Sequence, residues 1–143
     1  SHATVNGQNP KTFTYEDDNI RITPNSLGGQ RMFLNIENKT DKTIALIWED
    51  SYYILSNVTV PASNSSFEVL KLADQKIAPG AKIVAQFWCE KYIFDFFGAE
   101  RAYKDSGETL VNRVVPTLLI NGEKKEYPIT IELYTKKNLR ERN

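Results

Sequence analysis

The sequence is short of the residue types that most metal sites, disulfides and catalytic centres use. Its 143 residues include one cysteine, Cys89, and one histidine, His2. A single cysteine excludes an internal disulfide. One cysteine and one histidine are also too few for a Cys/His zinc cluster. Lysine plus arginine and aspartate plus glutamate number 18 each, so the net charge is zero. A neutral chain gives no electrostatic reason to expect nucleic acid as a partner.

Long apolar runs and strongly helical segments are also lacking. No stretch approaches the roughly 20 residues that a membrane-spanning helix needs. The chain begins Ser1-His2-Ala3 without methionine, which is typical of the remnant of a removed tag, so any signal peptide would lie upstream. We expect residues 1–11 to form a flexible leader and residues 136–143 a basic tail.

The chain is instead rich in short segments in which apolar and polar residues alternate, the pattern of strands with one buried face. The clearest segments are residues 32–37, 44–48, 83–87 and 129–133. Trp48 is in phase with Ile44 and Leu46, so we expect it in the core. The pattern predicts an all-β fold: an antiparallel immunoglobulin-like β-sandwich of about seven or eight strands over residues 12–135.

Turn-forming residues separate these segments. Asn121-Gly122 is the strongest hairpin signal, and Leu27-Gly28-Gly29 and Pro79-Gly80 are further turns. Pro24 is expected to end the strand that begins at Ile20. The polar linker 38–43 predicts that strands 32–37 and 44–48 are antiparallel neighbours.

Residues 89–114 break the alternation and form a long aromatic-rich loop, in which a short helix and a strand continued from Phe87 are both open. Long loops in compact domains often carry function. Residues 89–114 and the nearby strands together contain more aromatic residues than the core of one sandwich easily accommodates. One interpretation is a second, smaller core under the loop, and the other is a protein- or glycan-binding patch. The candidate partner-binding residues are Tyr52, Tyr53, Trp88, Tyr92, Phe94 and Phe97.

Catalytic and metal-binding patterns are weak. A serine or cysteine nucleophile needs a base, and the chain offers no histidine beyond His2 and no Ser-x-x-Lys motif, so we expect no catalytic residue and no cofactor. The acidic segments 16–18 and 49–50 could bind calcium or serve a carboxylate-based hydrolase, but we favour their interpretation as solvated turns. Cys89 follows Phe87 and Trp88, and we interpret it as a buried packing residue rather than a reactive thiol.

Four segments together resemble a known group of proteins. They are Phe33–Ile44 with its Asn-Lys-Thr turn, Ile47–Tyr52 with a tryptophan followed by acidic residues and serine, Ile77–Lys82 with its Pro-Gly turn, and Val115–Ile120. The order is similar to small bacterial cell-envelope proteins, commonly lipoproteins, with a single immunoglobulin-like β-sandwich. The resemblance covers roughly residues 30–134. The lipid-acceptor cysteine of such proteins would lie upstream of Ser1.

The resemblance implies a periplasmic or extracellular location and no reaction. We therefore expect a non-enzymatic binding or assembly module, monomeric or weakly dimeric, whose partner is another envelope protein or a cell-surface component. A membrane contact is expected only through an upstream lipid anchor. The alternative is a calcium- or glycan-binding domain.

Overall fold

The computed structural model describes residues 3–64, 73–96 and 109–134, which form three antiparallel sheets. In spatial order, sheet A contains β1 (Ala3–Val5), β13 (Ile129–Leu133), β10 (Leu110–Val115), β6 (Tyr52–Leu55) and β7 (Val58–Pro61). Sheet B contains β2 (Tyr15–Glu16), β3 (Ile20–Gly28), β4 (Arg31–Asn38) and β9 (Lys82–Trp88). Sheet C contains β12 (Glu123–Glu126), β11 (Thr117–Ile120), β5 (Ile44–Leu46) and β8 (Gln75–Ile77). The prediction of an all-β antiparallel fold is confirmed.

Sheets A and C are two halves of one bent layer, because the same long chain segments pass through both. Pro116 alone separates β10 from β11, and Pro128 follows Tyr127 between β12 and β13. Proline cannot donate to a β ladder, so the pairing is interrupted there and the strands bend. Between β5 and β6 the chain is interrupted at the same level by a 3-10 turn, Trp48–Asp50. These three interruptions each divide one long strand in two, so the 13 strands of the described residues correspond to ten longer segments, more than the predicted seven or eight.

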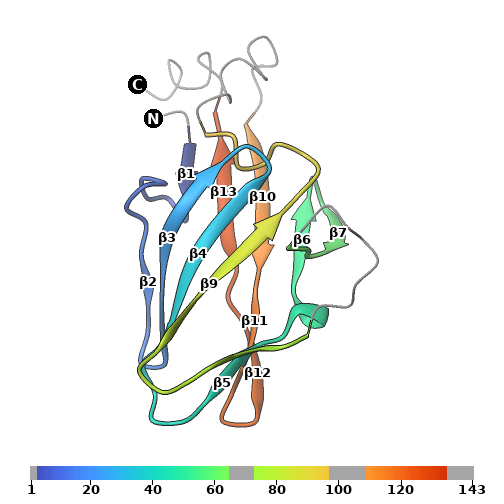
Figure 1. Cartoon of the computed structure of the whole chain (residues 1–143). Helices are drawn as coiled ribbons and strands as arrows, with labels where there is room; N and C mark the ends of the chain where they lie inside the picture. The colour runs from blue at the N-terminus through green and yellow to red at the C-terminus, as the bar shows by residue number, and fades with distance from the viewer. Residues whose placement is uncertain (1–2, 65–72, 97–108, 135–143) are drawn as a thin grey trace.

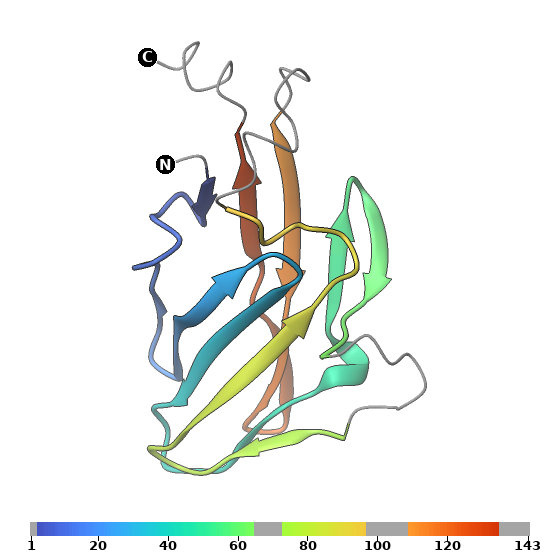
Figure 2. The same cartoon turned by 45° about the horizontal axis from the view of Figure 1, so that its top comes forward.

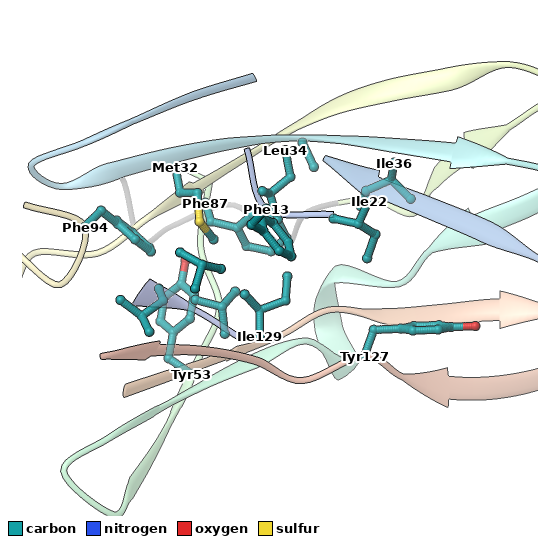
Figure 3. Packing of buried hydrophobic residues seen from close by; sticks show 14 of the residues in the cluster. Phe13, Ile22, Met32, Leu34, Ile36, Tyr53, Phe87, Phe94, Tyr127 and Ile129 are labelled. Atoms are coloured by element: carbon teal, nitrogen blue, oxygen red, sulfur yellow. The ribbon is translucent and has the colours of Figure 1, made fainter. Parts of the chain in front are cut away.

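Sheet B lies in front of this bent layer, and the hydrophobic core fills the space between them (Figures 1 and 2). Inward-pointing residues of sheet B such as Met32, Leu34 and Phe87 face Tyr53 and Ile129 of sheet A (Figure 3). All five side chains are buried, and the alternation read from the sequence predicted the inward phase of the sheet B residues. The molecule is therefore a two-layer sandwich. Trp48 is buried as expected and packs against Phe87 with ring centroids 5.0 Å apart.

The segment after β9 closes one end of the sandwich. Cys89 N–H donates to the Gln30 carbonyl (2.9 Å) and Phe94 N–H to the Gly29 carbonyl (3.2 Å), which fasten it to the β3–β4 turn. Phe94 is fully buried, and Ile93 is nearly so. The described part of this region, residues 89–96, contains turns and no helix, and residues 97–108 lie outside the described part of the chain.

The predicted tight turns are confirmed. Asn121 and Gly122 both have positive φ (53° and 78°), the left-handed conformation that a two-residue type I′ hairpin requires, and they join β11 to β12. Gly29 (φ 59°) and Gly80 (φ 72°) occupy the other two turns.

The predicted pairing of strands 32–37 and 44–48 is wrong: β4 pairs with β3 and β9, whereas β5 pairs with β11 and β8. Asn38 lies where the chain passes from sheet B to sheet C, and the hydrogen bonds of its buried side chain hold this crossing in place. Its Nδ2 donates to the carbonyls of Lys42 (2.7 Å) and Ile77 (2.9 Å). Its Oδ1 accepts from the N–H (2.9 Å) and hydroxyl (2.6 Å) of Thr40.

Two further predictions are corrected. The supposed flexible leader contains β1, whose Ala3 and Val5 are fully buried and which pairs with β13, so apolar burial orders it. Pro24 does not end its strand, because an irregularity between Pro24 and Ser26 lets β3 continue to Gly28. The predicted basic tail, residues 136–143, lies outside the described residues.

Candidate functional site

The structure separates the six aromatic residues predicted to bind a partner. Tyr53 and Phe94 are buried in the core, which corrects their assignment to a contact surface: neither side chain is accessible to a partner. Tyr52 lies on the outer face of sheet A, where its hydroxyl donates to Glu126 Oε2 (2.6 Å). Phe97 lies outside the described residues. Trp88 and the exposed Tyr92 remain as candidates near the end of β9.

Tyr53 is a structural residue that joins the two layers. Its hydroxyl lies 2.7 Å from the Trp88 carbonyl oxygen and 2.9 Å from that of Ser63, and it accepts the Ser63 N–H at 3.3 Å. Burial raises the pKa of this phenol well above its ordinary value, so it stays neutral and able to donate. Trp88 is thus held in place through its main chain, because its N–H also donates to Ser63 (2.8 Å).

Trp88 belongs to the outer face of sheet B, the side turned away from the core. Successive residues of a strand point to opposite faces, so on β4 and β9 the residues between the buried ones point outward. Phe33 lies between buried Met32 and Leu34, and Trp88 follows buried Phe87. Both aromatics are half-buried, as the side chains of an uncovered sheet face should be. In Figures 1 and 2 no described segment crosses this face.

Strand register arranges the outer face of sheet B in four rows. Listed across β3, β4 and β9, they are Arg21–Glu37–Lys82, Thr23–Asn35–Val84, Ser26–Phe33–Gln86 and, across β4 and β9 alone, Arg31–Trp88. Phe33 is therefore the diagonal neighbour of both Val84 and Trp88, which gives a short apolar diagonal. Val84 is 46% exposed. The candidates predicted from the sequence include Trp88 but not Phe33 or Val84, although the alternation of residues 32–37 and 83–87 places both on the face opposite the buried residues.

A set of side-chain amides and hydroxyls borders this diagonal. Asn25 Nδ2 donates to Asn35 Oδ1 (3.3 Å), and Asn35 Nδ2 donates to Thr23 Oγ1 (3.4 Å). Gln86 Nε2 donates to the Asn64 carbonyl. Each amide nitrogen carries two protons, so these bonds orient the groups and leave each able to make another.

The acidic segments proposed for calcium or hydrolysis are engaged with their own neighbours. Asp17 Oδ1 accepts the N–H groups of Asn19 (2.8 Å) and Ile20 (2.9 Å), and Glu16 pairs with Lys39 at 2.8 Å. Asp50 pairs with Lys124 at 2.6 Å. Within residues 3–64, 73–96 and 109–134, no three acidic, histidine or cysteine side chains converge as a metal site would require.

Cys89 is buried, as the sequence analysis predicted, and desolvation raises the pKa of its thiol. The Ser51 hydroxyl is used in structural hydrogen bonds: its Oγ donates to the Ile47 carbonyl (2.8 Å) and accepts the Thr117 N–H (3.0 Å). Neither side chain has the setting of an activated nucleophile.

A second surface feature is an open hollow of about 740 Å³ on the outer face of sheet C. Ala45 and Leu119 line it, together with Lys42 and Lys76. Both lysines are exposed, so their attraction for an anion is screened by solvent. The outer face of sheet B, with two oriented aromatics, is the stronger candidate.

No protein-family model matches the chain, and no curated protein matches it. One solved structure, described as "Crystal structure of protein from Archaeoglobus fulgidus", aligns with this chain at a TM-score of 0.36 and 13% sequence identity. The alignment covers 87% of this chain and 98% of the archaeal chain. Values of this size establish neither a family nor a shared fold. The described residues also contain no helix with the length and hydrophobicity that crossing a bilayer requires.

Proposed function

We propose that this chain is a non-enzymatic binding module of the bacterial cell envelope that contacts its partner through the outer face of sheet B. One observation carries the proposal: Phe33 and Trp88 are half-buried, diagonal neighbours on a sheet face bordered by oriented amides. Aromatic side chains at a surface are the residue type that most often anchors a partner. Val84 adds exposed apolar area between the same two strands.

An immunoglobulin-like arrangement of the sandwich is part of the proposal, and strand order supports it. One layer runs β3–β4–β9, which corresponds to strands A, B and E of that fold. The other layer runs β13–β10–β6, with β12–β11–β5 as its bent continuation, which corresponds to G, F and C. Trp48, buried within the C-equivalent segment, is where such sandwiches place a core tryptophan.

The non-enzymatic part of the proposal is supported by how the polar side chains are used. Glu16, Asp17, Asp50 and Ser51 are engaged in the contacts described above, and Cys89 is buried. The envelope location is supported by the sequence resemblance alone. We propose a monomer or weak dimer, with another envelope protein or a cell-surface component as partner.

Sedimentation with bacterial envelope fragments tests this function. Wild-type protein should co-sediment, and the double variant Phe33→Ala plus Trp88→Ala should lose most of the binding. The matched control is Ile54→Ala plus Val111→Ala, two apolar residues on the outer face of sheet A. Circular dichroism melts should show that all three proteins fold. Equal binding by the two double variants, or no binding by the wild type, would contradict the proposal.

A further inference from the structure

We infer that the occupant of the outer face of sheet B is a neutral oligosaccharide; this inference rests on the binding function proposed above and adds the chemical class of the partner. The first argument is the distribution of charge. The two middle rows, Thr23–Asn35–Val84 and Ser26–Phe33–Gln86, contain no charged residue. Charges lie only in the two end rows.

The charges of the end rows are partly compensated within the face itself. Arg21 donates to Glu37 Oε2 through Nε (2.9 Å) and through a second guanidinium nitrogen, so this pair is neutral as a unit, whereas Lys82 and Arg31 leave positive charge at the two ends of the face. A charged group lying on the middle rows themselves would lose hydration without a counter-charge in the same row. A neutral ligand has no such cost, so the middle rows favour an uncharged occupant over a charged one.

The second argument is the mixture of apolar and polar groups. The rings of Phe33 and Trp88 offer flat apolar area, to which the C–H face of a sugar ring is suited. The amides of Asn25, Asn35 and Gln86 can each both donate and accept, as sugar hydroxyls also do. A dense row of such groups beside an aromatic is the pattern of a site that fixes orientation by hydrogen bonds and gains affinity from apolar contact.

A protein partner suits this face less well. Protein interfaces of ordinary stability bury about 800 Å² on each side and have a continuous apolar centre surrounded by a polar rim. Here the amide of Asn35 lies between Thr23 and Val84, in the middle of the face. The Asn25–Asn35–Thr23 hydrogen bonds also fix these side chains before binding, which reduces the entropy that ordering them would cost.

The fluorescence of Trp88 provides a direct readout of sugar binding. Of the two tryptophans, Trp48 is 3% exposed in the core, so Trp88 is the one that a surface ligand can affect. The probes are oligosaccharides of neutral glucose, of N-acetylglucosamine and of a charged uronic acid. We expect a neutral probe to change the emission and the uronic acid not to do so.

Variants separate a site from a general surface effect. Phe33→Ala should weaken binding of the neutral probe at least about tenfold, and Asn35→Ala about threefold or more. Trp88→Phe should retain binding by calorimetry while the emission change disappears. The control Ile54→Ala, on the opposite layer, should bind as the wild type does.

Treated envelope fragments distinguish this inference from the proposed function. Binding that survives protease digestion and is lost after periodate oxidation of sugars supports the oligosaccharide. Binding that is lost after protease digestion and survives periodate overturns it in favour of a protein partner, and leaves the binding function standing. Absence of binding to untreated fragments and to every soluble probe would overturn both. Preference for the uronic acid probe would overturn the argument from charge.

Discussion

The hydroxyl of Tyr53, on β6, lies 2.7 Å from the carbonyl oxygen of Trp88, the last residue of β9. One buried phenol thereby joins sheet A to the edge of sheet B and fixes the main chain of the aromatic residue that we place in the binding face. The hydroxyl of the preceding residue, Tyr52, is bound instead to Glu126 on the opposite side of the layer. Adjacent tyrosines therefore have different roles because strand neighbours point to opposite faces.

Tyr53→Phe should lower the free energy of unfolding by about 1–3 kcal/mol, because two carbonyls and the Ser63 N–H lose a buried partner. The measurement is urea unfolding followed by circular dichroism. The matched control is Tyr52→Phe, which removes an exposed hydrogen bond to Glu126 and should change stability by no more than about 0.5 kcal/mol. Equal effects of the two variants would show that the buried hydroxyl does not join the layers.

Asn38→Ala should destabilise the domain more strongly, by about 2–4 kcal/mol. The substitution removes the donors to Lys42 and Ile77 and the acceptor for Thr40 at a fully buried position, and each group left without a partner carries a desolvation cost. Urea unfolding measures the effect, with Asp41→Ala as a control on an exposed residue of the same linker. An effect of Asn38→Ala as small as that of Asp41→Ala would contradict the role assigned to Asn38.

The contrast between local and distant contacts explains what the sequence could predict. Alternation predicts the strands over residues 32–37 and 83–87 and the burial of Trp48, and the Asn121-Gly122 hairpin follows from the backbone preferences of two residues. The choice of strand partners could not be predicted, because it depends on contacts such as that of Asn38 with Ile77, 39 positions away. Tyr53 and Phe94 were placed on a surface for the same reason: aromatic enrichment is visible in sequence, but burial depends on the other layer.

For Tyr127, removal of the hydroxyl should not lower the free energy of unfolding. In the described part of the chain its buried hydroxyl has no hydrogen-bond partner, and in Figure 3 it points away from the core cluster. Removing an unsatisfied buried group relieves a desolvation cost, so Tyr127→Phe should leave stability at pH 7 unchanged or raise it by up to about 1 kcal/mol. Tyr15→Phe is the control: its ring contacts Tyr127 edge-on at 5.6 Å, and its hydroxyl is bound to Asp17 (3.0 Å).

The same residue predicts a response to alkaline pH. Desolvation, with the nearby Asp17 carboxylate, raises the pKa of Tyr127 to about 12, from an ordinary value of 10.0. The unfolded chain therefore loses this phenolic proton at a lower pH than the folded protein does, so the stability of the wild type is unaffected by Tyr127 ionisation below pH 10 and falls as the pH rises toward 12. Urea unfolding at a series of pH values should show a shallower alkaline decline for Tyr127→Phe than for the wild type. Parallel declines would show that Tyr127 ionises as easily in the folded state as in the unfolded chain.

Cys89 allows the closed end of the sandwich to be tested chemically. The side chain is 5% exposed and desolvation raises the pKa of its thiol, so a thiol reagent at pH 8 should react mainly through opened states. We expect labelling of the folded protein to be at least about 100-fold slower than labelling in denaturant. Because Cys89 directly follows Trp88, Tyr53→Phe should accelerate labelling, whereas Tyr52→Phe should not. The chain has no other cysteine, so Cys89→Ser gives the background, and rapid labelling of the folded wild type would contradict the burial of this segment.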